Sequence, residues 1–173
     1  MNTLTVRSRA LVIMLVVGLL AVVGISSAAG HATAQKYGGT PTADGYGAFW
    51  MRIPHGCMDA KGNTLGTTRV VVFLPNAFQS TKPQQIAGWK SSVRQLKSGV
   101  RRVQWVATGA ALRDDEFQDF GITVQYPAKA RTYGLPTIQY CGASHRTAWI
   151  ERMVGDVEPE HPMPTITVSP AIG

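Results

Sequence analysis

The feature that most constrains the fold is a series of short segments in which apolar and β-branched residues alternate with polar ones. This period of two is typical of half-buried strands, and no stretch of about 12 residues after position 30 shows helical periodicity. Turn-forming residues such as Gly38-Gly39 and Lys97-Ser98-Gly99 separate the segments. Strands are expected at residues 46–53, 67–74, 89–96, 100–107, 117–126, 136–140, 147–153 and 165–168. Short strands at this spacing predict an all-β chain folded as an immunoglobulin-like antiparallel β-sandwich.

The amino-acid composition further narrows the class of protein to which the chain can belong. Charged residues make up only 16% of the 173, while 18 glycines and 10 prolines supply many turns, which excludes a coiled coil or a disordered acidic tail. The net charge of +7 raises the question of nucleic-acid binding. Basic residues, however, are scattered singly, Arg101-Arg102 is the one adjacent pair, and no stacking aromatics alternate with them. We therefore expect solvated surface charge and no nucleic-acid partner.

The first thirty residues have the layout of a secretory signal peptide. Arg7 and Arg9 precede an apolar run from Leu11 to Ile25, and small residues follow up to Gly30. An uncleaved membrane anchor is the alternative, but a membrane span needs roughly 18 or more apolar residues. We expect cleavage before His31, a periplasmic or secreted protein, and no stable membrane span after cleavage.

The boundaries of the folded part follow from this cleavage. Residues 31–157 are expected to form one domain, because a chain of roughly this length can bury a core of its own. Residues 158–173 begin with Glu-Pro-Glu-His-Pro-Met-Pro, so they are expected to form a proline-rich, extended tail that could add a strand.

Two cysteines, Cys57 and Cys141, fit an exported protein. Outside the cytoplasm an even number of cysteines most simply forms a disulfide. This bridge would close a loop of about 84 residues, which the chain-entropy model values at roughly 4–5 kcal/mol. The alternative is a metal pair of Cys57 with His55, but an oxidised sulfur has no thiolate to offer a metal. A structural disulfide is therefore expected.

If cleavage falls before His31, the mature protein begins with a histidine whose α-amine is free. The amine and the imidazole Nδ1 of one residue can chelate a single metal ion, with the next backbone amide within reach. An α-amine titrates near about pH 8, so a metal displaces its proton at little cost. Nitrogen donors in a square arrangement suit Cu(II), which heads the affinity order of divalent first-row metals. The alternative is that His31 is simply the residue that cleavage leaves first.

Other residues could complete such a site. Residues 113–120 place four acids beside a predicted strand, where they would supply a carboxylate ligand or form a solvated acidic turn. Trp149, taken alone, is more often a core residue than a neighbour of a metal. His55, His145 and His161 lack the spacing of a closed zinc site. Nucleophile elbows, phosphate-binding glycine loops and dinucleotide fingerprints are absent from the sequence, so no enzyme class has motif support.

Several landmarks follow one another along the chain in a recognisable order. They are His31, the segment 46–53 ending in Pro54-His55-Gly56-Cys57, Thr67-Thr68-Arg69-Val70 running to Leu74-Pro75, Pro83, Gly88-Trp89, Trp105, Glu116-Phe117-x-x-Phe120 with Pro127, Gln139-x-Cys141, and Trp149. Together they resemble the YcnI-type copper-binding domain of exported bacterial proteins. The resemblance covers roughly residues 31–168, and its specificity comes from the order of the landmarks rather than from any one of them.

This resemblance implies a β-sandwich that binds Cu(II) through an N-terminal histidine brace. His31 would supply amine and imidazole, Glu116 the carboxylate, and Trp149 a neighbouring indole. The loop leading into the acidic segment departs from the family's paired glycine turn, so Asp119 or Asp115 could be the ligand instead. In an extended strand, however, both would face away from Glu116.

We therefore expect an exported, non-enzymatic protein that binds a copper ion, Cu(II), and serves as a copper chaperone in trafficking or homeostasis with other copper proteins of the cell envelope. A copper monooxygenase-like enzyme is the first alternative, because a histidine brace also occurs there. Those enzymes normally use a second histidine, and no motif places one here. A metal-free exported interaction module is the second alternative.

Overall fold

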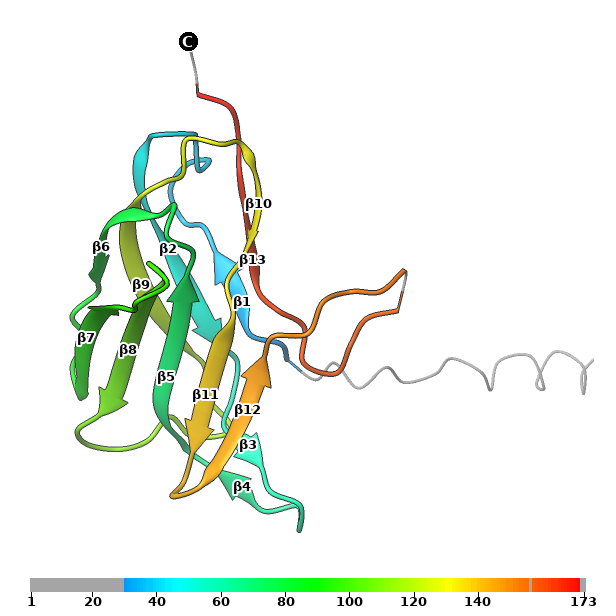
Figure 1. Cartoon of the computed structure of the whole chain (residues 1–173). Coiled ribbons are helices and arrows are strands. Elements are labelled where there is room, and N and C mark those ends of the chain that lie inside the picture. The colour runs from blue at the N-terminus through cyan, green and yellow to red at the C-terminus, as the bar shows by residue number, and fades with distance from the viewer. Residues whose placement is uncertain (1–29, 156, 172–173) are drawn as a thin grey trace, which may run out of the picture.

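The computed structural model describes residues 30–155 and 157–171, and within them the regular elements are all β-strands (Figure 1). The predicted signal peptide, apart from Gly30, lies outside the described residues. The strands are β1 (Thr33–Gln35), β2 (Tyr46–Ile53), β3 (Cys57–Met58), β4 (Thr64–Leu65), β5 (Thr67–Leu74), β6 (Gln79–Pro83), β7 (Trp89–Gln95), β8 (Arg101–Ala107), β9 (Gln118–Gln125), β10 (Arg131–Gly134), β11 (Thr137–Cys141), β12 (His145–Trp149) and β13 (Thr165–Val168).

The strands form two main antiparallel sheets that pack face to face. One sheet has the order β1-β2-β9-β6 and the other β12-β11-β5-β8-β7. In Figure 1 the five-stranded sheet lies in front of β1 and β2. Two small pairs, β10-β13 and β3-β4, extend the sandwich at its ends. The predicted all-β antiparallel sandwich is confirmed.

The core lies between the two sheets and follows from the alternation in the sequence. On β2 the side chains of Phe49, Met51 and Ile53 are fully buried. They face the other sheet, whose β8 contributes Val103 and Trp105, also fully buried. Each such apolar side chain gains about 1.5–3 kcal/mol by leaving water. The alternation that predicted the strands therefore also predicts which of their faces forms the core.

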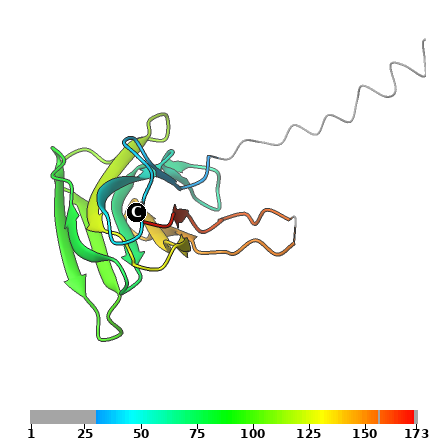
Figure 2. The same ribbon diagram turned by 90° about the horizontal axis from the view of Figure 1, so that it is seen from above.

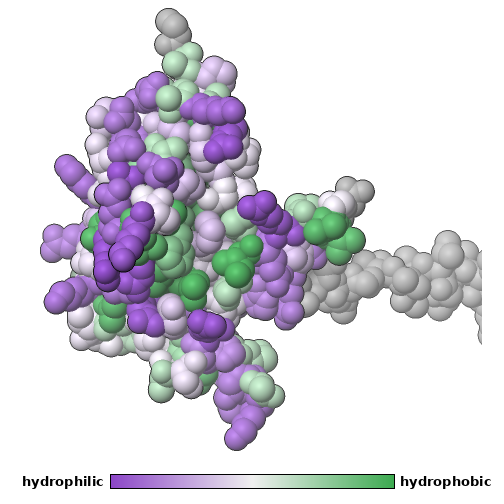
Figure 3. Space-filling view, viewed as in Figure 1, coloured by the Kyte–Doolittle hydropathy of each residue, from purple (hydrophilic) through white to green (hydrophobic). Residues whose placement is uncertain are grey.

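The C-terminal part returns to the sandwich after a projection. Residues 150–155 and 157–164 leave the end of β12, extend away from the body and come back to β13 (Figures 1 and 2). β13 pairs with β10 and buries Ile166 and Val168 in the main core. The projection exposes apolar side chains at its outer end, among them Val154 and Val157 (Figure 3).

The predicted disulfide between Cys57 and Cys141 is present. It joins the first residue of β3 to the last residue of β11, with 5.9 Å between their Cα atoms, and both residues are buried. The bridge ties the small β3-β4 hairpin to the five-stranded sheet. Among the described residues there is no helix long and apolar enough to cross a membrane.

Candidate metal centre

The register between β1 and β2 decides what surrounds the predicted mature N-terminus. Thr33 pairs with Arg52, and continuing this antiparallel register by three residues places Gly30 opposite His55. β2 itself stops at Ile53, because the following residue, Pro54, has no amide hydrogen for the ladder. Sequence positions 30 and 55 are therefore brought together by strand pairing rather than by proximity along the chain.

His31 lies between a carboxylate and an indole. Its Nδ1 is 3.2 Å from Oε1 of Glu158, which the returning projection carries to this point. Its ring centroid is 6.0 Å from that of Trp149 at the end of β12. The His31 side chain is 24% exposed, whereas Trp149 is buried. The site thus combines an accessible imidazole, an oxygen ligand suited to a cation, and one buried aromatic wall.

A buried hydrogen-bond network positions the Trp149 indole. The indole Nε1 of Trp149 donates to Oε1 of Gln139 at 3.1 Å. The side-chain nitrogen of Gln139 donates to the backbone carbonyl of His55 and to the hydroxyl of Thr67, both at 2.7 Å. Because the indole can only donate, the amide oxygen of Gln139 must face it. Fully buried Gln139 therefore links Trp149 rigidly to the segment that carries His55.

His55 is held by backbone carbonyl groups on both sides of its ring. Its Nδ1 is 2.6 Å from the carbonyl oxygen of Gly56, and its Nε2 is 3.1 Å from that of Gly30. The carboxylate oxygen Oδ1 of Asp114 lies 3.8 Å from the same Nδ1. The imidazole is about one-third exposed. It therefore stands beside the predicted cleavage site with one ring nitrogen directed at it.

A cavity of about 660 Å³ opens next to these groups. Gly30, His55 and Trp149 line it, together with His145 of β12 and His161 of the projection. The ring of His161 lies 5.3 Å from that of Trp149, centroid to centroid. Across residues 30–155 and 157–171, however, no three His, Cys, Asp or Glu side chains come close enough to hold a metal ion by themselves.

The predicted carboxylate Glu116 is not brought to His31. In the first sheet β2 lies between β1 and β9, so the residues before β9 are separated from the N-terminal segment by the end of β2. Glu116 is exposed there, with an oxygen 3.7 Å from Nη2 of Arg113. Asp115 accepts two hydrogen bonds from Arg113, at 2.8 and 2.7 Å. Both acids precede the first residue of β9, so the alternation of side chains along a strand does not decide which way they point.

Asp119, the other alternative, is engaged elsewhere. Both of its oxygens accept hydrogen bonds from Arg52 at 2.8 Å, and Oδ2 also accepts one from the Tyr37 hydroxyl at 2.6 Å. Burial opposes its ionisation, but the hydrogen bonds from Arg52 and Tyr37 and the Arg52 charge hold the pKa of this carboxyl below its ordinary value. Asp119 thus ties β9 to β2 as an ion pair.

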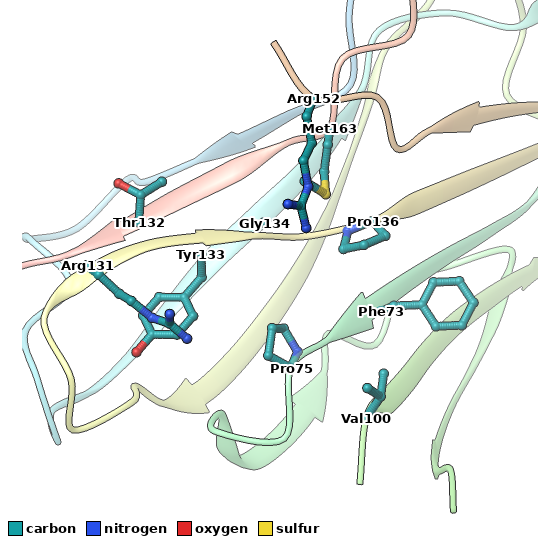
Figure 4. A pocket seen from close by; sticks show the side chains of 10 residues that line it. All are labelled: Phe73, Pro75, Val100, Arg131, Thr132, Tyr133, Gly134, Pro136, Arg152 and Met163. Atoms are coloured by element: carbon teal, nitrogen blue, oxygen red, sulfur yellow. The ribbon is translucent and has the colours of Figure 1, made fainter. Parts of the chain in front are cut away.

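A second cavity, of about 520 Å³, has different chemistry (Figure 4). Two arginines line it: Arg131 lies over the ring of Tyr133, and Arg152 lies beside Met163 (Figure 4). The residues that line this cavity include no carboxylate, thiol or imidazole. Its cationic, apolar lining is unsuited to a metal cation.

Sequence reasoning missed three groups at this site. Glu158 was assigned to an extended tail, and no local pattern could indicate that the tail returns to His31. His55 was considered as a metal ligand only together with Cys57, and its position next to Gly30 was not predicted. Gln139 did leave a signal, because it is a polar residue on the same strand face as Thr137 and Cys141, a face that is fully buried.

Comparisons with known proteins assign this region to a family. A family model described as a domain of unknown function, DUF1775, matches residues 31–168. The chain belongs to this family. The resemblance to the YcnI-type domain is thereby confirmed, and it is supported by a curated relative. The chain is 25% identical over 120 residues to the copper-binding protein CutI of Bacillus subtilis (strain 168).

The alignment with CutI covers 69% of this chain and 54% of the relative, so the chain spans about half of that protein's length. Among solved structures, the chain is similar to an uncharacterized protein from Nocardia farcinica with an immunoglobulin-like fold. The TM-score is 0.68 at 28% identity, covering 80% of this chain and 98% of that one. A cohesin module of a Clostridium perfringens ATCC13124 family 33 glycoside hydrolase gives a TM-score of 0.51 at 11% identity, covering 81% and 96%, and shares the fold alone.

Proposed function

We propose that the protein is exported, is cleaved after Gly30, and binds one Cu(II) ion at its new N-terminus as a carrier in copper trafficking of the cell envelope. His31 supplies its α-amine and imidazole, Glu158 supplies a carboxylate oxygen, and Trp149 covers one side of the site. The name of the relative CutI supports copper as the cargo. The observation that carries the proposal is the contact of His31 Nδ1 with the Glu158 carboxylate at 3.2 Å beside the buried indole.

The donor set fits Cu(II) on chemical grounds. Imidazole and amine nitrogens suit Cu(II), and a carboxylate offsets part of its charge. The Glu158 carboxylate already faces the coordinating nitrogen of His31, and its own side chain is 65% exposed, so it can move to accommodate an ion. Glu116, which the resemblance favours, is occupied with Arg113 and lies across the end of β2. We therefore assign the carboxylate role to Glu158.

We further propose a binding role rather than catalysis. A copper monooxygenase that attacks polysaccharides would need a flat, exposed aromatic face to stack on sugar rings. Trp105 and Trp149 are buried, and Trp149 is fixed by its hydrogen bond to Gln139. Trp50 and Trp89 are partly buried, so none of the four tryptophans offers such an exposed face. A metal-free interaction module, the other alternative, offers no reason for an imidazole, a carboxylate and an indole to meet at the N-terminal residue.

Electron paramagnetic resonance tests the proposal. The protein is prepared with His31 as its first residue and is given one equivalent of Cu(II). We expect a nitrogen-rich, type 2 signal that His31→Ala changes, because the imidazole ligand is lost while the α-amine remains. His145→Ala, which changes a histidine of the cavity beside the site, is the matched control and should leave the signal unchanged. An aquo-copper spectrum in the wild-type protein, or an unchanged spectrum in His31→Ala, would contradict the proposed function.

A further inference from the structure

A second imidazole, that of His55, lies beside the proposed site and is not one of the ligands assigned so far. Nε2 of His55 is 3.1 Å from the carbonyl oxygen of Gly30, and a Cβ built on Gly30 would lie 3.4 Å from Cδ2 of the same ring. That Cβ would also lie only 2.8 Å from Cβ of Pro54. Gly30 is therefore packed directly against Pro54 and the His55 ring.

The hydrogen bonds of His55 indicate which ring nitrogen is free. A neutral imidazole has one N–H donor and one acceptor nitrogen. Nδ1 lies 2.6 Å from the Gly56 carbonyl oxygen, closer than Nε2 lies to that of Gly30, and the Asp114 carboxylate is 3.8 Å from Nδ1, so we assign the hydrogen to Nδ1. This assigns the lone pair to Nε2. An Nδ1–H donated to a backbone carbonyl is the arrangement that orients histidines bound to metals through Nε2.

In the uncleaved chain this lone pair faces another acceptor, the oxygen of Gly30. Cleavage removes that conflict. Water adds its hydroxyl to the Gly30 carbonyl carbon, the C–N bond breaks, and the hydrogen passes to the nitrogen of His31. Gly30 leaves as the carboxylate end of the signal peptide. The space in front of Nε2 is then open, and its nearest new neighbour is the α-amine of His31.

The distances permit both nitrogens to bind one ion. The oxygen and nitrogen of one peptide group are about 2.3 Å apart, so Nε2 of His55 lies at most about 5.4 Å from the nitrogen that becomes the amine. Two nitrogens bound to one metal at about 2.0 Å stand about 3 Å apart when cis and about 4 Å apart when trans. A side-chain movement of about 1–2 Å closes the remaining gap.

We propose that Nε2 of His55 is a third nitrogen ligand of the copper ion, beside the amine and Nδ1 of His31. The inference rests on the proposed function, since it needs copper at the cleaved N-terminus. It converts a brace made by one histidine into one made by two. Gln139, which holds the backbone carbonyl of His55, then positions a ligand as well as the indole wall.

Pulsed electron paramagnetic resonance counts the imidazoles, because the remote nitrogen of each bound ring modulates the signal. The sample is the protein beginning at His31 with one equivalent of Cu(II). We expect two imidazoles in the wild-type protein. In His55→Gln we expect one imidazole and an affinity about tenfold or more lower, because an imidazole ligand has been lost. His145→Gln, in the same cavity, should retain both imidazoles and full affinity.

The outcomes distinguish a failure of this inference from a failure of the proposed function on which it rests. One imidazole in the wild-type protein, with a spectrum unchanged in His55→Gln but changed in His31→Ala, overturns the role of His55 and leaves the proposed function intact. Copper binding with the same affinity and the same spectrum in His31→Ala overturns both. A count of one imidazole in the wild-type protein overturns the role of His55 even if a variant does not fold.

Discussion

Replacing Gln139 by leucine should destabilise the protein through one buried network. The side chain is fully buried and makes three hydrogen bonds, to Trp149, His55 and Thr67. Leucine has a similar volume, so no large cavity opens. The indole N–H of Trp149 loses its partner, which costs about 1–3 kcal/mol for a buried donor.

The other two partners lose less, because the Thr67 hydroxyl can still donate to the His55 carbonyl oxygen, at 3.4 Å. Their share is about 0.5–1.5 kcal/mol, so Gln139→Leu should lower the free energy of unfolding by about 2–4 kcal/mol. For a domain of this size the melting temperature falls by on the order of 10 °C. Thermal unfolding of the oxidised protein measures the melting temperature, and denaturant unfolding measures the free energy of unfolding.

Gln95→Leu provides the matched control, because Gln95 is exposed on β7 and the same substitution there should change stability by no more than about 0.5 kcal/mol. If Gln139→Leu is also within about 0.5 kcal/mol of the wild type, the buried network does not stabilise the fold and the reasoning is refuted.

Three further predictions concern the ligands and the frame of the site. Glu158→Gln should weaken Cu(II) binding in a competition titration by about tenfold, whereas Glu116→Gln should leave it unchanged; a larger loss at Glu116 would return the carboxylate role to that residue. The folded-state pKa of Asp119 lies below its ordinary value near 3.8, so the unfolded chain takes up a proton first and stability is lost as pH falls through and below that value. Denaturant unfolding from about pH 5 to about pH 2 should therefore show a steeper loss in the wild type than in Asp119→Asn, and parallel curves would contradict the ion pair with Arg52. Reducing the disulfide, which spans 84 positions, should lower stability by about 4–5 kcal/mol while the folded fraction keeps its copper, and loss of copper without unfolding would show that the bridge belongs to the site.

The long strands were predictable because their own residues determine them. Segments 46–53 and 67–74 coincide with β2 and β5, since alternating apolar residues form one buried face of β2 and a run of three valines is buried in β5. β1 and β6 escaped prediction because they are short and their residues are mostly polar or exposed. Such edge strands exist through pairing with a neighbour, here β2 and β9, which no local pattern encodes.

The site was predictable only in part, for a similar reason. The family resemblance places Trp149 near His31, and the two ring centroids lie 6.0 Å apart. The mature start at His31 stays a prediction. Glu116 was chosen as part of an extended strand, but the chain turns there before β9 begins. Glu158 reaches His31 through a tertiary contact, and His55 reaches Gly30 through strand register. Neither relation can be read from neighbouring residues.

The central claim is that cleavage before His31 creates the copper site. The most direct measurement compares one sample before and after cleavage: the chain is fused through Gly30 to a folded carrier, and a protease then leaves His31 first. Every side chain of the domain is identical in the two states, so only the α-amine and the departure of Gly30 differ. Competition titration with a Cu(II) chelator should show binding at least about a hundredfold tighter after cleavage, equivalent to about 2.7 kcal/mol. Equal affinity in the two states would contradict the account, because the amine would then contribute nothing to the site.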